Sequence, residues 1–220
     1  MMKSQKTGFL YAGIALLGLF ALWTGLIRTV DVRAAGETGT EIGFASLNVW
    51  FHRLTGVHMW LYNATDWLGL VPVFVCLLFA GVGCVQLFGR KSLRKVDGDI
   101  LLLGVYYVLV IGCYLLFEMY PVNYRPILIE GRMEASYPSS TTLLVLSVMP
   151  TLVFQTRRRL KNGNMKKGIA VLTTTFSALM VVGRLISGVH WLTDIVGAVL
   201  LSAGMFCVYR GAVALCEEMP

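Results

Sequence analysis

Three ionisable side chains interrupt a mainly apolar stretch of the chain, residues 181–201, which reads VVGRLISGVHWLTDIVGAVLL. They are Arg184, His190 and Asp194. Ionisable groups at membrane depth are costly, so they usually face protein, water or a ligand. Residues four apart share one face of a helix, so Asp194 could hold one ring nitrogen of His190 and leave the other free to act as a base or nucleophile.

The residues between Arg184 and His190 determine whether these two side chains can meet. An unbroken helix would place them about 240° apart around its axis, at roughly 100° per residue. Gly188 permits a chain reversal, and Ser187 is a favourable N-cap for a second helix. We therefore expect a cation to face an imidazole across a helix N-terminus, a common anion site. The alternative is that Arg184 anchors a helix end and that His190 and Asp194 form an ordinary pair.

Two more polar motifs lie earlier in the chain. Arg125-Pro126 belongs to the polar loop 118–138, and Pro138 followed by hydroxyl residues opens the next apolar run. Such a helix start offers backbone N–H groups and hydroxyls to an anion, although plain capping would need no ligand. On one membrane face with His190, both motifs would complete a phosphate site that contains a nucleophile. The candidate phosphate ligands are Arg125, Arg184, Ser139, Ser140 and Thr141.

The composition is that of one integral membrane domain. Of the 220 residues, 56% are hydrophobic, and the mean hydropathy is +0.70, as in proteins that cross a bilayer. The first apolar run could be a signal peptide, but its length favours a retained anchor. The apolar runs predict an all-α bundle of six transmembrane helices, at residues 8–27, 67–89, 100–117, 140–155, 169–186 and 190–209.

The longest polar stretch, residues 28–66, contains aromatic and apolar residues at helix-like spacing, including Trp50 and Trp60. This pattern is typical of a helix at the level of the lipid headgroups, which could line a lipid entrance or be inert. We divide the membrane domain into an N-terminal anchor with an outward interfacial segment, residues 1–66, and a core, residues 67–220. The five cysteines form no pair in a polar loop and no metal-ligand spacing, so we predict no disulfide, metal or cofactor.

The basic residues predict the orientation in the membrane. With six spans, thirteen Lys and Arg residues lie on the side of the termini and six on the other side. The positive-inside rule then places both termini in the cytoplasm and the loops 28–66, 118–138 and 187–189 outside. Because the basic runs are explained as topology signals, the high positive charge does not indicate a nucleic-acid partner.

The residues of these motifs resemble those of the type 2 phosphatidic acid phosphatase (PAP2) and vanadium haloperoxidase superfamily. That family has three motifs, Lys-x6-Arg-Pro, Pro-Ser-Gly-His and Ser-Arg-x5-His-x3-Asp. The third reads Gly183-Arg184-x5-His190-x3-Asp194 here, and the first reads Glu118-x6-Arg125-Pro126. The second reads Pro138-Ser139-Ser140-Thr141. The resemblance covers residues 67–209. The predicted membrane spans exclude a soluble haloperoxidase.

The resemblance implies a role for each matching residue. His190 would form a phosphohistidine without a metal, Asp194 would orient it, and Arg125, Arg184 and the Ser139–Ser140 region would hold phosphate oxygens. The family's second-motif His protonates the leaving oxygen, which Thr141 cannot do well, so we expect a preference for diphosphates. Glu118 replaces a family Lys, and we expect Arg132 of the same loop to supply the lost charge, unless it is an ordinary interfacial cation.

These observations predict a membrane phosphatase that hydrolyses a lipid phosphate or diphosphate at the outer leaflet, in a bacterium at the plasma membrane. Undecaprenyl diphosphate, phosphatidate or phosphatidylglycerol phosphate would be candidate substrates. Two alternatives remain. The first is a catalytically impaired member that binds or transports an anionic lipid, which Glu118 and Thr141 favour. The second is a phosphotransferase of the same fold that passes the phosphoryl group to another lipid.

Overall fold

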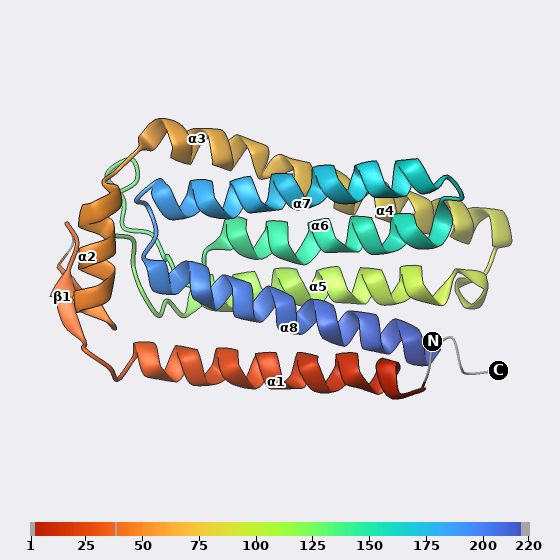
Figure 1. Ribbon diagram of the computed structural model, residues 1–220, viewed down its shortest axis with the longest axis horizontal. Helices are drawn as coiled ribbons and strands as arrows, with labels where there is room; N and C mark the ends of the chain where they lie inside the picture. Colours follow the sequence, from red (N-terminus) through yellow and green to blue (C-terminus); the bar gives the residue numbers. More distant parts are fainter. Residues whose placement is uncertain (1–2, 38, 217–220) are drawn as a thin grey trace.

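The protein, described by a computed structural model over residues 3–37 and 39–216, is a bundle of long helices. The helices run along the longest axis of the molecule, with both ends of the chain at the same end of the bundle (Figure 1). They are α1 (Lys3–Ile27), α4 (Leu70–Arg90), α5 (Gly98–Met119), α6 (Ser140–Arg159), α7 (Gly163–Ile186) and α8 (Leu192–Cys216).

Within the part of the chain that the structure describes, five stretches are long and apolar enough to cross a membrane: Thr7–Ile27, Met59–Arg90, Gly98–Met119, Gly163–Ile186 and Leu192–Cys216. Large apolar side chains on their outer faces are exposed, among them Phe74, Phe88 and Leu172. Such a surface suits lipid, and the chain is an integral membrane protein.

The predicted fourth span coincides with α6, which is not among these five stretches. Its Ser, Thr and Gln side chains lower its hydropathy, and the structure shows where they go. The Tyr107 hydroxyl lies 2.6 Å from Thr151 Oγ1, and Gln155 Nε2 donates to the Tyr209 hydroxyl at 2.6 Å. Because α6 packs against α4, α5, α7 and α8, its polar groups meet protein rather than lipid.

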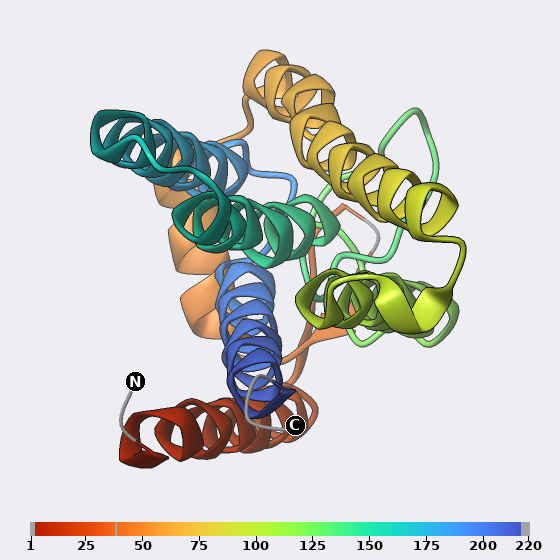
Figure 2. The same cartoon turned by 90° about the vertical axis from the view of Figure 1, so that its right-hand side faces the viewer.

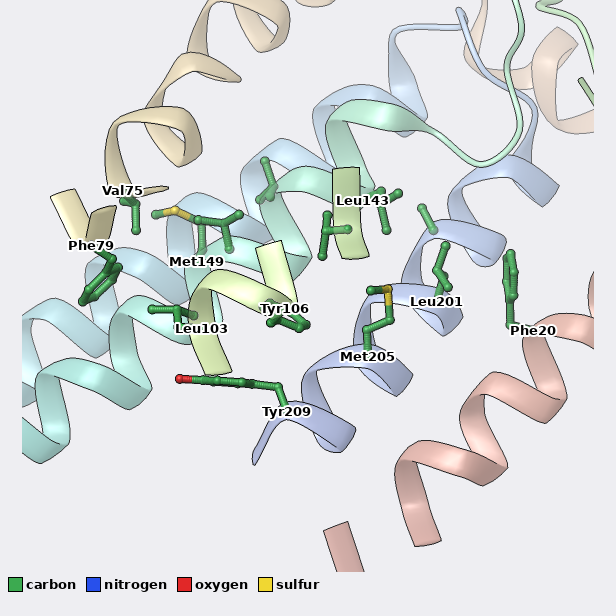
Figure 3. Close-up of a cluster of buried hydrophobic side chains, with 14 of the residues drawn as sticks. Phe20, Val75, Phe79, Leu103, Tyr106, Leu143, Met149, Leu201, Met205 and Tyr209 are labelled. Carbon is green, nitrogen blue, oxygen red and sulfur yellow. The ribbon is translucent and has the colours of Figure 1, made fainter. Parts of the chain in front are cut away.

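The apolar core lies between α5, α6 and α8 (Figure 3). Tyr106 and Tyr209 stack with ring centroids 5.1 Å apart, and Leu143 and Leu201 are almost fully buried. Helix α1 lies on the outer side of the bundle, where it packs against α8 (Figure 2) and contributes Phe20 and Ile27 to this core. Burial therefore makes α8 the centre of the bundle, and the residues that precede it are held firmly.

Short elements cover the end of the bundle opposite the chain termini (Figure 1). They are the antiparallel strands β1 (Arg33–Ala35) and β2 (Thr40–Ile42), in which Ala34 pairs with Glu41, and the helix α2 (Ala45–Thr55). Helix α3 (Met59–Leu68) begins at this end and runs along the bundle (Figure 1). Helix α2 lies across the end and exposes Trp50 and Leu54, as an interfacial helix would. Helix α3 runs on into α4, so the division expected between residues 66 and 67 falls within α3.

The loops with the candidate residues meet at this covered end. The connections 120–139 and 187–191 lie beside α2, whereas the 3₁₀ turn η1 (Leu93–Lys95) and the 160–162 connection lie at the end of the chain termini (Figure 1). Polar motifs far apart in the sequence thus meet at one end.

Candidate active site

The break between α7 and α8 differs in one respect from the sequence-based expectation. Ser187 is not the N-cap of a new helix: it ends α7, its hydroxyl donates to the Arg184 carbonyl at 2.8 Å, and α8 begins only at Leu192. Gly188 does reverse the chain, with φ of 73°. A Cβ atom there would lie 2.1 Å from the Gly56 carbonyl oxygen, so only glycine fits beside the segment that follows α2.

His190 lies in this break, before α8 begins, so it does not share a helix face with Asp194. Its side chain is buried, and its Nδ1 atom lies 3.2 Å from the Ser136 carbonyl oxygen. A carbonyl oxygen can only accept a hydrogen bond, so Nδ1 carries the proton and Nε2 carries a lone pair. Nε2 is buried and has no hydrogen-bond partner among the described residues.

The sequence predicts a direct hydrogen bond between Asp194 and the His190 ring, but in the structure the Asp194 carboxylate supports the break instead. Its Oδ2 atom lies 3.8 Å from His190 Nδ1, which is too long for a hydrogen bond. Oδ2 accepts from the Trp191 backbone N–H at 2.9 Å, and Oδ1 accepts from Asn123 Nδ2 at 3.0 Å. This carboxylate therefore ties the 120–139 loop to the start of α8, and it lies near His190 without bonding to the ring.

Arg184 and Arg125 approach the same aromatic ring. Their guanidinium carbons lie 4.8 Å and 5.7 Å from the Tyr62 ring centroid, within cation–π distance. Arg184 is 1% exposed, and its Nη1 donates to the Tyr62 carbonyl and Thr65 hydroxyl, both at 3.4 Å. Arg184 Nε and Arg125 Nη1 are buried without a partner among the described residues. Strong donors thus converge from α7 and from the 120–139 loop.

The electrostatics of the site keep His190 neutral. Burial of the imidazole, together with the positive charges of Arg125 and Arg184, holds the pKa of His190 well below its ordinary value. The unprotonated form of the ring is therefore favoured at neutral pH. A neutral imidazole beside two guanidinium groups can attack an electrophile that the guanidinium groups bind.

The start of α6 brings its hydroxyl residues to the same region. The Ser139 backbone N–H donates to the Asp194 carbonyl at 3.3 Å, and Ser139 Oγ donates to Thr142 Oγ1 at 3.1 Å. Ser139 is the N-cap residue, but its side chain makes no capping hydrogen bond. Ser140 and Thr141 instead face two cavities that meet at this helix start.

The first cavity, here called the polar pocket, has a volume of about 200 Å³. Glu118, at the end of α5, lines it together with Arg125, which carries the second guanidinium of the site. Arg132 does not line it: the side chain is exposed at the turn where Ile129 and Arg132 pair. The residues of the polar pocket used below are Tyr114, Glu118, Arg125, Glu134, Ser136 and Ser140.

The second cavity, here called the apolar groove, has a volume of about 500 Å³ and lies between α4, α5 and α6. Ser140 and Tyr114 line both cavities, so the two are contiguous. Thr141 lines only the groove, and Asp66, the ion-pair partner of Arg184, lies at its α3 end. The walls of the groove include Leu70, Val73, Val110, Ile111, Leu144 and Val148.

Sequence reasoning missed the residues that hold the break from outside. Asn48 of α2 is fully buried; its Nδ2 donates to Thr193 Oγ1 at 3.0 Å, and its Oδ1 accepts from the Thr193 backbone N–H at 3.3 Å. His52, one turn later, lies with Nε2 3.1 Å from the Gly188 carbonyl oxygen. The spacing of four between Asn48 and His52 was the available signal, since it puts both on one helix face.

Comparisons with known proteins identify a family for this chain. The family model described as PAP2 superfamily matches residues 10–215, and it therefore includes the segment before residue 67. A search of curated proteins found no match. Among solved structures, the chain is similar to the first transmembrane PAP2 type phosphatidylglycerolphosphate phosphatase from Bacillus subtilis. The TM-score is 0.68 at 18% identity, over 96% of this chain and 100% of that chain.

Proposed function

Because the chain belongs to the PAP2 superfamily, we propose that it is a membrane phosphatase that releases phosphate from a lipid phosphate or diphosphate. The observation that carries the proposal is the buried Nε2 atom of His190, which has no hydrogen-bond partner among the described residues. Burial and the positive charges of Arg125 and Arg184 lower the pKa of His190 and keep this nitrogen unprotonated. An electron-rich nitrogen beside two guanidinium groups suits attack on phosphorus.

The reaction has two steps. His190 Nε2 attacks phosphorus, the bond from phosphorus to the leaving oxygen breaks, and a phosphohistidine forms. Arg125 and Arg184 would stabilise the charge that develops on the phosphoryl oxygens. Water then attacks the phosphohistidine and restores the free imidazole. The two steps need only the side chains described, the substrate and one water molecule, which supplies the oxygen of the released phosphate and, overall, the proton of the leaving alcohol or phosphate. We propose a mechanism that requires no metal.

The cavities favour a lipid as the substrate. A phosphate held by Arg125 would lie at the polar pocket, and Ser140 joins that pocket to the apolar groove. The acyl or prenyl chain attached to the phosphate could lie in the groove, whose walls are mainly apolar. The oxygen that joins the headgroup to the chain would then be close to Ser140 and Thr141, at the start of α6.

We also propose six membrane crossings, with α6 as the fourth, and an outward-facing site. The length of α6, 20 residues, gives about 30 Å at the usual helical rise, enough for the bilayer core. The basic residues at 90–95 and 157–167 are at the end of the bundle opposite the 187–191 connection between α7 and α8 (Figure 1). The positive-inside rule assigns that end to the cytoplasm, and the plasma membrane of a bacterium is the proposed location.

One experiment tests the function directly. Detergent-purified protein is incubated with a panel of lipid monophosphates and diphosphates, with and without EDTA, and released phosphate is measured. We expect release from at least one lipid, unaffected by EDTA, and none from the His190→Ala variant. Release that depends strictly on a metal would contradict the mechanism.

A second function is favoured by one observation, the ion pair of Arg125 with Glu134, which lie 3.1 Å apart. Because this carboxylate competes with a phosphate for Arg125, the protein could bind or transport an anionic lipid without turnover. In that case the panel lipids would bind and no phosphate would appear. A phosphotransferase would form the same phosphohistidine, so adding a lipid alcohol would give a new phospholipid instead of free phosphate.

A further inference from the structure

The polar pocket contains two carboxylates next to its buried guanidinium. Glu118, in the last turn of α5, and Glu134, near the end of the 120–139 loop, line the pocket with Arg125. Arg125 is 7% exposed, and its Nη1 atom is buried without a partner among the described residues. The pocket therefore offers a donor for an anion and two acceptors for a cation within about 200 Å³.

Both arginines of the site already face carboxylates. Glu134 Oε2 lies 3.1 Å from Arg125 Nε, without hydrogen-bond geometry. Asp66 Oδ1 lies 3.5 Å from Arg184 Nη2. A phosphate that binds these arginines must share them with, or take them from, carboxylates that stay nearby.

The charges around the site do not suit a bare phosphate. Two guanidinium groups, Arg125 and Arg184, stand against the carboxylates of three residues, Asp66, Glu118 and Glu134. A phosphate monoester adds up to two further negative charges. In a partly buried site, repulsion between like charges is screened less than in water. A positive group on the same ligand would remove this repulsion and leave Arg125 available to the phosphate.

We propose that the polar pocket binds an ammonium group that the substrate carries next to its phosphate, between the carboxylates of Glu118 and Glu134. The inference rests on the proposed phosphatase function and names its substrate class: amphiphiles with a primary amine beside the phosphate ester. An ammonium has three donors and no acceptor, so two carboxylates and the Ser136 region can surround it. The pocket is several times the roughly 30 Å³ share of a water molecule and has room for an aminoalkyl group.

A divalent cation is the rival occupant, because Mg²⁺ is commonly held by one or two carboxylates together with substrate phosphate. Within the described residues, no group of three or more His, Cys, Asp and Glu side chains could hold a metal. A metal that bridges Glu118, Glu134 and the phosphate would make turnover sensitive to EDTA. An ammonium on the substrate would not.

The test compares two lipids that differ only in the amine: octadecyl phosphate, and the same molecule with a primary amine on the second carbon. We expect the amine to raise kcat/KM of the wild type by roughly tenfold or more, as for a hydrogen-bonded charge pair, mainly through KM and equally with EDTA present. Glu118→Gln and Glu134→Gln should bring the ratio of the two lipids close to one, and Glu134→Asp should restore part of it. Glu134→Gln should also speed turnover of octadecyl phosphate, because it frees Arg125.

The matched control is Glu130→Gln. Glu130 is in the same loop but exposed at its tip and does not line the polar pocket, so this variant should keep the wild-type ratio. Equal kcat/KM for the two lipids in the wild type would overturn the ammonium site and leave the phosphatase function intact. EDTA-sensitive turnover would assign the carboxylates to a metal instead.

Binding measurements distinguish a failure of the phosphatase proposal from a failure of the ammonium-site proposal. Affinities of both lipids for the wild type and the three glutamate-to-glutamine variants are measured in detergent by calorimetry. If neither lipid is hydrolysed, the phosphatase proposal fails, and tighter binding of the amino lipid that is lost in Glu118→Gln and Glu134→Gln would still support the pocket. Equal binding of the two lipids would overturn it.

Discussion

The Nδ1 atom of His190 lies 3.2 Å from the carbonyl oxygen of Ser136, and this contact determines which ring nitrogen can react. The carbonyl accepts the Nδ1 proton, so the lone pair is on Nε2, the nitrogen that lacks a partner among the described residues. The orienting group is thus a backbone atom of the 120–139 loop. Asp194 acts one step further away, through Asn123 of the same loop and the Trp191 N–H.

We predict that His190→Ala lowers phosphate release by a factor on the order of 10⁶, as loss of a nucleophile does elsewhere. Rapid acid-free quenching of the wild type with radiolabelled lipid phosphate should trap an acid-labile phosphoryl group on Nε2. The control is His58→Gln, because the His58 ring lies with Nε2 2.9 Å from the Thr55 carbonyl oxygen, and the hydrogen bond from His58 to the Ser187 carbonyl is made by the backbone N–H, which the substitution keeps. Unchanged turnover in His190→Ala would exclude the proposed nucleophile.

The pH dependence should reflect the lowered pKa of His190. Protonation removes the nucleophilic lone pair, so activity is lost as the pH falls through this pKa and is retained above it. Because burial and the charges of Arg125 and Arg184 hold the pKa well below its ordinary value, kcat/KM should not show an acid limb from His190 near pH 6.5, the ordinary value of a histidine.

Arg125→Gln provides the comparison for this prediction. It removes one of the positive charges that lower the pKa, so the acid limb should move to higher pH in the variant. The substrate's own second ionisation, near pH 6, is common to both proteins, so the difference between the two pH–rate profiles reports on His190. Profiles with the same acid limb would contradict the assignment.

Asn48 is predicted to hold the catalytic break in place. Asn48→Ala removes three hydrogen bonds of a fully buried side chain, to Gly43 and to both the Oγ1 and the N–H of Thr193. Leaving these partners unpaired should lower the free energy of unfolding by about 1–3 kcal/mol, seen as a lower Tm in detergent. We also expect kcat to fall more than KM rises. The control, Asn63→Ala, alters an exposed residue of α3 and should change neither.

The proposed topology can be tested by labelling. In a variant without the five native cysteines, Glu130→Cys should react with a membrane-impermeant thiol reagent added outside intact cells, and Lys161→Cys should react only after permeabilisation. Both positions are exposed, so the difference reports the side of the membrane. Labelling of position 161 from outside would reverse the orientation and put the site in the cytoplasm.

The helices could be predicted from the sequence because the lipid-facing runs are apolar over their full length, as in α4 and α5. The grouping of Arg125, Arg184 and His190 could also be predicted, since their spacing follows the family motifs. The contribution of α2 and α3 to the site could not be predicted from the sequence. Tyr62, Thr65 and Asp66 contact Arg184 across more than 115 residues of sequence, and no local pattern encodes such packing.

Two expectations failed because one-dimensional spacing does not give a turn's geometry. His190 and Asp194 are four residues apart, but α8 starts only at Leu192. The Asp194 carboxylate therefore accepts a hydrogen bond from the Trp191 N–H and none from the His190 ring. Arg132 shares a loop with Arg125, but the turn at Ile129–Arg132 carries it to an exposed tip. We therefore expect Arg132→Ala to leave KM for the lipid nearly unchanged, whereas Arg125→Ala should raise it.

The last prediction concerns Thr141 and the leaving group. Thr141 lines the apolar groove beside Ser140, which reaches both cavities, so it is close to where the leaving oxygen would lie. A threonine is a poor acid, and positioned acid catalysis is typically worth about 10²–10⁴ in rate. An alcohol leaving group resembles water, with a pKa on the order of 15.7, and suffers this loss, whereas a phosphate leaving group, with a second pKa of about 6, needs little help.

We therefore expect the wild type to hydrolyse lipid diphosphates faster than monophosphates of the same chain. Thr141→His should speed monophosphate hydrolysis by at least roughly tenfold more than diphosphate hydrolysis, measured as kcat for both substrates. This is less than the roughly 10²–10⁴ of positioned acid catalysis, because a substituted imidazole is not positioned by the surrounding residues. Thr141→Ser, which keeps a hydroxyl and adds no acid, is the control and should leave the ratio of the two rates unchanged. If monophosphates are already hydrolysed as fast as diphosphates and Thr141→His alters neither rate, another group must protonate the leaving oxygen. Glu134, in the adjoining polar pocket, would then be the first residue to substitute.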